Sequence, residues 1–173
     1  MFRRSTSGAA RIFAGAAIEW RSKRQATVSL SSSEAEYVAA AEASRAVVYV
    51  RQLLAHLCFA QRGPTPLLLD SQAAIGAALQ EANNQRRKHI DAKHHYLREQ
   101  VLNGVIELRW VPTAEQAADI FTKALPRAAF AQHRATVMNL PSDSGHAHVG
   151  RGQRTAAAAA QPDADADGHS HVD

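Results

Sequence analysis

The 173-residue chain has very little cysteine: Cys58 stands alone, so no disulfide can form within the chain. It also lacks any apolar run near the roughly 18–20 residues that a membrane-spanning helix needs. The charged start at Arg3 and Arg4 is not followed by the apolar stretch of a signal peptide. We therefore expect an intracellular protein, cytoplasmic or nuclear, with no membrane association.

Large apolar side chains are almost missing from residues 141–173, which consist mainly of Ser, Gly, Ala, Asp and His. This composition predicts a low-complexity, disordered C-terminal tail behind a domain over residues 1–140. The domain carries 18 basic and 11 acidic residues, whereas the tail has Arg151 and Arg154 against five Asp. A basic body suits a polyanionic partner such as nucleic acid, although charge alone fits ordinary solubility equally well.

Hydrophobic periodicity and turn residues predict an alternation of strands and helices, which is typical of a mixed α/β domain. The expected strands cover 7–13, a bent strand at 18–21 and 26–30, 66–70 and 105–111, and the expected helices cover 31–60, 71–80, 90–102, 113–125 and 127–138.

Two capping boxes mark helix starts in this pattern, Ser31-x-x-Glu34 and Thr113-x-x-Gln116. In the first helix the apolar stripe, extended toward the N-terminus, reaches Glu36, whereas Glu34 lies about 200° around the helix. A carboxylate at the edge of a buried face must be paired, protonated or bound to a cation. Glu36 is therefore a candidate ligand, with pairing to a nearby Lys or Arg as the alternative.

Asp70 ends the apolar run Leu67-Leu68-Leu69 and precedes a helical segment. A carboxylate at the C-terminal end of a buried strand lies where open α/β sheets collect ligands, although it could equally cap the following helix. Asp119 is a further candidate, and its alternative is a surface ion pair with Lys123 at i, i+4.

Six motifs in fixed order carry a family resemblance. They are Arg4-Ser5-Thr6-Ser7-Gly8; Trp20-x-Ser22-Lys23-x-Gln25; Ser31-Ser32-Ser33-Glu34-Ala35-Glu36-Tyr37; Asp70-Ser71-Gln72-Ala73-Ala74-Ile75; Lys88-His89-Ile90-Asp91 with His95 and Arg98-Glu99; and Trp110-Val111-Pro112 with Gln116, Ala118-Asp119 and Thr122-Lys123. Together they resemble the ribonuclease H domain of copia-type retrotransposon Pol polyproteins, over about residues 3–140. The resemblance implies a mixed five-stranded sheet flanked by helices and cleavage of RNA in RNA–DNA hybrids.

The resemblance also implies a site of four carboxylates that hold two Mg²⁺ ions, with Mn²⁺ as a substitute. Glu36, Asp70 and Asp119 match three of them as catalytic and metal-binding residues. The fourth belongs to a first strand that precedes all these motifs, and no Asp precedes Asp70 here. We therefore expect a partial domain without its first strand, in which at least one ion binds weakly. The alternative is a catalytically inactive retroelement remnant that only binds nucleic acid or has no activity.

The expected partner is an RNA–DNA hybrid, alongside the reverse transcriptase part of a polyprotein, with no small-molecule cofactor. Ser33 and Gln72 could contact the hybrid through hydroxyl and amide groups, and Arg86, Arg87 and Lys88 could follow a phosphate backbone. A solvated loop explains the basic cluster equally well. Trp20, Trp110 and Tyr37 are expected in the core, and His89, His94 and His95 on a helix surface rather than around zinc.

Overall fold

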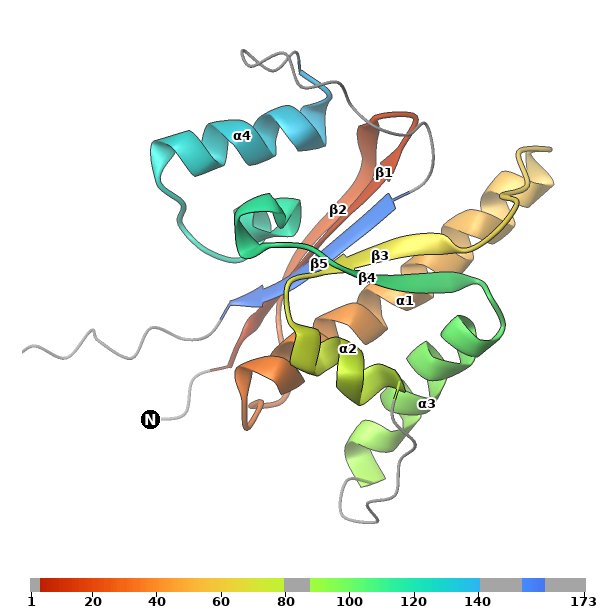
Figure 1. The fold of residues 1–173 in the computed structure, drawn as a ribbon, viewed down its shortest axis with the longest axis horizontal. Coiled ribbons are helices and arrows are strands. Elements are labelled where there is room, and N and C mark those ends of the chain that lie inside the picture. The colour runs from red at the N-terminus through yellow and green to blue at the C-terminus, as the bar shows by residue number, and fades with distance from the viewer. Residues whose placement is uncertain (1–3, 80–87, 141–153, 161–173) are drawn as a thin grey trace, which may run out of the picture.

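The computed structural model describes residues 4–79, 88–140 and 154–160, which form a mixed α/β structure around one sheet (Figure 1). The sheet has five strands in the order β2-β1-β5-β3-β4. The strands are β1 (Thr6–Phe13), β2 (Ala16–Arg24), β3 (Thr65–Leu69), β4 (Ile106–Trp110) and β5 (Arg154–Ala160). The helices are α1 (Ser32–His56), α2 (Gln72–Leu79), α3 (Lys88–Leu102) and α4 (Arg127–Met138), with 3-10 turns η1 (Thr113–Glu115) and η2 (Ala117–Phe121). No helix in these described ranges combines the length and apolarity needed to cross a membrane.

Helix α1 begins as its capping box predicts. The backbone N–H of Glu34 donates to Ser31 Oγ at 3.1 Å, and the Glu34 carboxylate accepts from the N–H of Leu30 at 2.8 Å. After this cap, the buried face of the helix includes Ala40, Ala43 and Val47, which belong to the main core. Helix α3 also ends at Leu102, where the sequence predicted. Just beyond it, Gly104 takes a left-handed φ of 65° and its N–H donates to the carbonyl of Val101.

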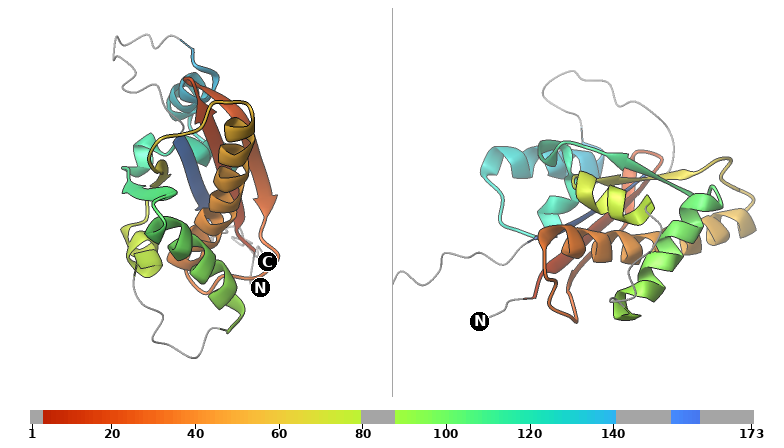
Figure 2. Two further views of the ribbon diagram at one scale, coloured as in Figure 1. Left: turned by 90° about the vertical axis from the view of Figure 1, so that its right-hand side faces the viewer. Right: turned by 60° about the horizontal axis from the view of Figure 1, so that its bottom comes forward.

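The sheet separates two layers of helices (Figures 1 and 2). On one face, α1, α2 and α3 enclose the main core, to which the sheet contributes Leu67 and Leu69. On the other face, η2 and α4 pack Ala117 and Val137 against Ala10 of β1. Since Leu68 packs instead against Ala118 of η2, alternate residues of β3 serve opposite layers.

Strand β5 corrects the prediction of a wholly disordered tail, because residues 154–160 form a strand. It lies in the middle of the sheet, antiparallel to β1 and parallel to β3. Its run of five alanines, a residue that favours helices, gave no signal for a strand. The strand is held by backbone pairing on both sides. The rest of residues 141–173 lies outside the described residues.

Two other predicted elements are wrong. Residues 26–30 are not a strand, because the chain turns at Gln25, whose N–H donates to the carbonyl of Ser5 at 2.7 Å. Residues 113–125 do not form one helix, and no side chain caps η1. Gln116 is fully buried and its Nε2 donates to the carbonyl of Leu68 at 3.2 Å, so this side chain ties the segment to β3 and is not part of a capping box.

Candidate metal site

Asp70 follows the C-terminal end of β3, as predicted from the sequence. Leu67 and Leu69 anchor the strand in the core, and Asp70 emerges partly exposed. Its backbone carbonyl accepts a hydrogen bond from Trp110 Nε1 at 3.2 Å. The cap of α2 is provided by Ser71, whose Oγ accepts from the N–H of Ala74 at 3.1 Å. The Asp70 carboxylate is therefore not engaged as a helix cap.

Glu36 lies in the second turn of α1 and is buried, with 7% of its surface exposed. The start of α1 is tied to β1 through Gln25, whose Nε2 donates to the carbonyl of Ala35 and to Ser7 Oγ, both at 2.9 Å. The neighbouring Tyr37 is buried as expected for a core residue, and burial raises the pKa of its phenol above the usual range. The buried position predicted for Glu36 is thus confirmed.

Asp119 sits in η2, on the other face of the sheet, and is also buried. Its Oδ2 lies 2.7 Å from Lys123 Nζ, so the ion pair considered as the alternative role is present. The position of η2 depends on Gly8 of β1: a Cβ there would lie 2.5 Å from Thr122 Cγ2 and 2.8 Å from the carbonyl oxygen of Ala118. Glycine therefore allows η2, and with it Asp119, to approach the sheet.

The three carboxylates come from different parts of the fold: Glu36 from α1, Asp70 from the end of β3 and Asp119 from η2. Ser7 accepts a hydrogen bond from Gln25, which also donates to Ala35 of α1, whereas the adjacent Gly8 faces η2, so Glu36 and Asp119 approach from opposite faces. The first turns of α1 and α2 lie side by side near the end of β3 (Figures 1 and 2). Among the residues that the structure describes, no three His, Cys, Asp or Glu side chains form a group able to hold a metal ion.

Carboxylate oxygens suit a hard cation such as Mg²⁺, so the donor chemistry of this set is appropriate. The arrangement, however, does not fit a formed metal centre. Asp119 is neutralised by Lys123 at hydrogen-bonding distance. Binding of an ion by all three carboxylates would require Asp119 to exchange its ammonium partner for the metal.

His133 of α4 is a further buried ionisable residue, and it was not among the predicted site residues. Only 3% of it is exposed, and burial lowers the pKa of its imidazole, with the Asp119 charge opposing and the Lys123 charge reinforcing this shift. The imidazole is therefore electrostatically coupled to the Asp119–Lys123 pair. A signal was present in the sequence, since His133 and Val137 share the buried face of α4 at i, i+4.

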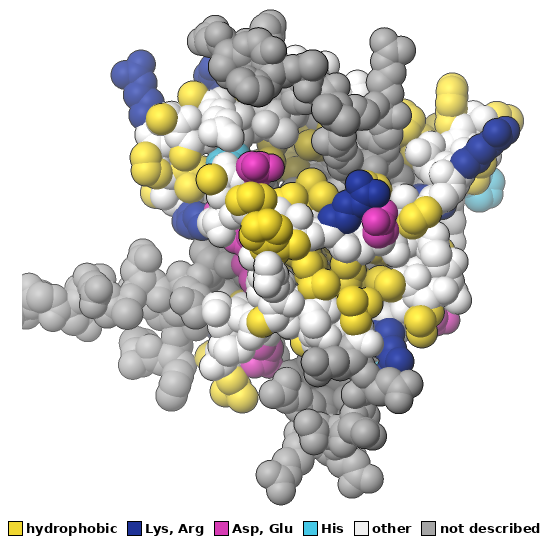
Figure 3. All heavy atoms as spheres, viewed as in Figure 1, with side chains coloured by type: hydrophobic (Ala, Val, Ile, Leu, Met, Phe, Trp, Pro, Cys, Tyr) yellow, Lys and Arg dark blue, Asp and Glu magenta, His cyan; other side chains and the backbone are white. Residues whose placement is uncertain are grey.

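The residues predicted to contact nucleic acid are only partly described. Ser33 is half-buried and its Oγ lies 3.0 Å from Ser31 Oγ, and Gln72 is exposed at the start of α2. Lys88 begins α3, but its side chain, like all of Arg86 and Arg87, lies outside the described part of the chain. On the face drawn in Figure 3, hydrophobic side chains gather near the centre, where basic and acidic side chains also lie next to each other, and further Lys and Arg side chains lie toward the rim.

Both tryptophans contradict the prediction that they belong to the core. Trp20 is 64% exposed and Trp110 is 49% exposed. Their strands, β2 and β4, are the two edges of the sheet, where side chains have fewer neighbours to cover them. Trp110 thus presents an exposed ring beside Asp70, to whose carbonyl it donates.

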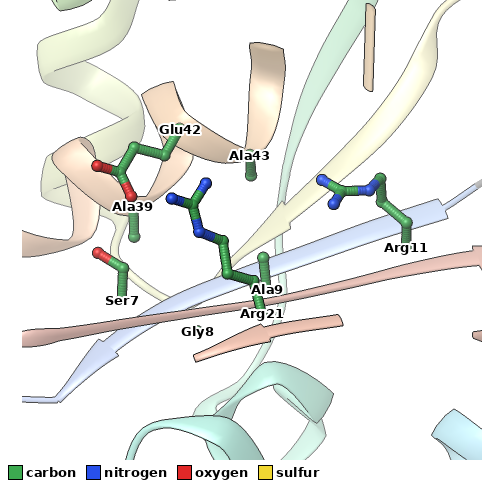
Figure 4. Close-up of a pocket in the computed structure, with 8 residues that line it drawn as sticks. All are labelled: Ser7, Gly8, Ala9, Arg11, Arg21, Ala39, Glu42 and Ala43. Carbon is green, nitrogen blue, oxygen red and sulfur yellow. The ribbon is translucent and has the colours of Figure 1, made fainter. Parts of the chain in front are cut away.

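A small pocket, whose lining includes none of the three carboxylates, lies between β1, β2 and α1 (Figure 4). Arg21 extends across it toward Glu42, and Arg11 points into the same space. Arg11 is 2% exposed and forms an ion pair with Glu19; burial, assisted by Arg21, lowers the pKa of its guanidinium to about 10. The lining residues are Ser7, Gly8, Ala9, Arg11, Arg21, Ala39, Glu42 and Ala43.

Comparison with known proteins identifies the class of relatives. The homologues of the chain are retrovirus-related Pol polyproteins of copia-type transposons. One is the polyprotein of transposon TNT 1-94 from Nicotiana tabacum, which is 37% identical over 128 residues, or 74% of this chain. Two more come from Arabidopsis thaliana: transposon RE2, 33% identical over 74% of the chain, and transposon RE1, 35% identical over 65%.

The chain spans about a tenth of the length of these polyproteins: 10% for TNT 1-94, 9% for RE2 and 8% for RE1. No family model matches the chain, and no solved structure matches it. The relationship therefore extends to one region of a retroelement polyprotein.

Proposed function

We propose that this chain is the ribonuclease H region of a copia-type retrotransposon polyprotein, whose chemistry is metal-dependent cleavage of the RNA strand in an RNA–DNA hybrid. The observation that carries the proposal is the position of Asp70: a carboxylate directly after a buried strand of a mixed five-stranded sheet, within the motif Asp70-Ser71-Gln72. Buried Glu36 on α1 and buried Asp119 on η2 are the other two acidic residues of the proposed site.

The proposed cofactor is Mg²⁺, with Mn²⁺ as a substitute, and the proposed ligands are Glu36, Asp70 and Asp119. Bound at these residues, such ions would supply activation of water and stabilisation of the leaving oxygen. The proposed substrate is an RNA–DNA hybrid that lies across the starts of α1 and α2, where Ser33 and Gln72 offer hydroxyl and amide groups. Arg86, Arg87 and Lys88 are proposed to contact its phosphates.

A second candidate function is a catalytically inactive remnant that binds nucleic acid or has no activity. A specific observation favours it: Lys123 occupies the Asp119 carboxylate at 2.7 Å, and a metal ion would have to displace that ammonium. The two candidates therefore differ in whether Asp119 is available to a cation.

The test is incubation of the purified full chain with labelled RNA–DNA hybrid and Mg²⁺. The enzyme hypothesis expects cleavage of the RNA strand that Asp70→Asn abolishes. The matched control is Glu115→Gln, an acidic residue exposed on η1, which should cleave as the parent chain does. Retention of the hybrid without cleavage supports the inactive binder, and cleavage that persists in Asp70→Asn contradicts the proposed site.

A further inference from the structure

Arg11 of β1 is a positively charged side chain that is almost completely buried. It is 2% exposed and forms an ion pair with half-buried Glu19, the residue directly opposite on β2. A guanidinium carries five N–H donors, and Arg11 Nε has no hydrogen-bond partner among the described residues. Because a buried charged group is stable only when it is paired and hydrogen-bonded, we expect a further acceptor beside Arg11.

The pocket between β1, β2 and α1 provides room for such an acceptor (Figure 4). Its walls include small residues such as Ala39 and Ala43, whose side chains leave the space open. Ser7 also lines the pocket and is buried. Its Oγ accepts a hydrogen bond from Gln25 Nε2, which leaves the hydroxyl proton able to donate. The pocket therefore offers a second polar donor besides the buried guanidinium.

A second cation lies across this pocket. Arg21 is exposed on β2, directly opposite Ala9, and extends across the pocket toward Glu42 (Figure 4). Burial, and to a smaller extent the charge of Arg21, lowers the pKa of the Arg11 guanidinium to about 10. The two arginines therefore repel each other, and an anion held by both would relieve that repulsion. Glu42 also lines the pocket, and its carboxylate would oppose an anion there.

The donors define the chemical class of the ligand. Guanidinium groups pair most strongly with the oxygens of phosphate and carboxylate groups, often through two parallel hydrogen bonds. A phosphate group presents several acceptor oxygens on one compact centre, so it can accept from two arginines and a hydroxyl together. The small pocket suits such a compact group better than a nucleobase or another large ligand.

We propose that the pocket between β1, β2 and α1 is a phosphate-binding site, in which Arg11 binds the anion from the buried side, Arg21 from the exposed side and Ser7 through its hydroxyl. Two sources share this chemistry: free inorganic phosphate and the terminal phosphate of a nucleic acid strand. None of the three carboxylates lines this pocket, so the proposal goes beyond the proposed function and does not depend on it.

Calorimetric titration of the purified full chain with inorganic phosphate, at neutral pH and constant ionic strength, tests the site. The parent chain should bind one phosphate. Arg21→Gln should weaken binding by about tenfold or more, because it removes a hydrogen bond between charged groups. The matched control is Arg24→Gln, which removes the same charge from an exposed position on the opposite face of β2 and should bind phosphate as the parent does.

Glu42→Gln provides a test in the opposite direction. Removal of the carboxylate that lines the pocket should tighten phosphate binding by about threefold or more, an effect that damage to the fold would not produce. Phosphate should also raise the thermal unfolding midpoint of the parent chain more than that of Arg21→Gln, since a ligand stabilises the state that binds it. Circular dichroism checks that each variant is folded.

A short DNA strand with a 5′-terminal phosphate, compared with the same strand without it, distinguishes the two sources. A preference for the phosphorylated strand that Arg21→Gln abolishes identifies a strand end as the ligand. Binding of inorganic phosphate without that preference identifies the free ion, and either result supports the site.

Three results would overturn the proposal. The first is that no probe binds in a manner dependent on Arg21. The second is equal weakening in Arg21→Gln and Arg24→Gln, which would show diffuse attraction to a basic chain. The third is unchanged or weaker phosphate binding by folded Glu42→Gln, which would mean that the anion does not lie in this pocket. Cleavage of the hybrid is measured separately, so none of these results decides the proposed function.

Discussion

β3 and β5 are parallel neighbours at the centre of the same sheet, yet they come from very different sequences. Leu67 of β3 and Thr155 of β5 lie opposite each other and both are fully buried. β3 has a leucine run that predicts a buried strand, whereas β5 is an alanine run in a segment poor in large apolar residues. The comparison shows that unpaired backbone edges and two enclosing layers can place a strand centrally without large side chains.

The largest expected effect is the loss of stability on shortening a buried side chain of β3. Leu67→Ala should lower the free energy of unfolding by about 2–5 kcal/mol, because it removes a fully buried side chain and leaves a cavity in the main core. The matched control is Leu53→Ala on α1, where the side chain is 47% exposed and the loss should be much smaller. Urea unfolding measures both values. Equal losses of unfolding free energy in the two variants would mean that Leu67 of β3 does not contribute more to the core than exposed Leu53.

Leucine content explains why β3 was predictable and β5 was not. The apolar run before Asp70, the cap at Ser31 and the stop at Gly104 each express a local rule, and each corresponding element formed. The position of β5 depends on edges supplied by β1 and β3, which are far away in the chain. No property of residues 154–160 alone carries that information.

Substitution of Gly8 tests the packing of η2, which covers β5 on the face opposite to α1. Gly8→Ala should cost about 1–3 kcal/mol, because its Cβ would overlap Thr122 and the backbone oxygen of Ala118 and push η2 from the sheet. Gly76→Ala in α2 is the matched control. Nothing lies within 4 Å of a Cβ there, so alanine should stabilise the helix by about 0.5–1 kcal/mol. Thermal or urea unfolding that gives both variants the same sign would contradict this account of η2.

The same substitution in the two strands should have opposite effects. Thr65 of β3 accepts a hydrogen bond from Arg51 Nη1 at 2.8 Å, so Thr65→Val should cost about 1–2 kcal/mol. Thr155 Oγ1 of β5 is buried with no hydrogen-bond partner among the described residues, so Thr155→Val should stabilise by about 1 kcal/mol. The measurement is the urea midpoint at constant m-value. A loss of stability in Thr155→Val would show that its hydroxyl is satisfied.

The burial of Glu36 and the position of Asp70 could be predicted from the sequence, but the contacts of the candidate residues could not. Burial of Glu36 followed from the stripe on α1, and Asp70 from the end of β3. The pairing of Asp119 with Lys123 was one of two alternatives that spacing left open. His133 was missed because its importance depends on α4 packing against η2, a tertiary contact that no local motif announces.

The smallest expected effect concerns His133, in the layer behind η2 that covers one face of β5. Burial lowers the pKa of His133 below its ordinary 6.5. In the window below about pH 6.5 the unfolded chain therefore binds a proton that the folded chain does not, so stability should fall as the pH drops from 7 to 5. His133→Gln removes this titration and should flatten the dependence of the free energy of unfolding on pH. His95→Gln, on the exposed face of α3, is the control and should retain the parent slope. If both variants keep the parent dependence of the free energy of unfolding on pH, protonation of His133 does not cause the loss of stability in acid. The buried imidazole would then not stabilise the packing of α4 and η2 over β5.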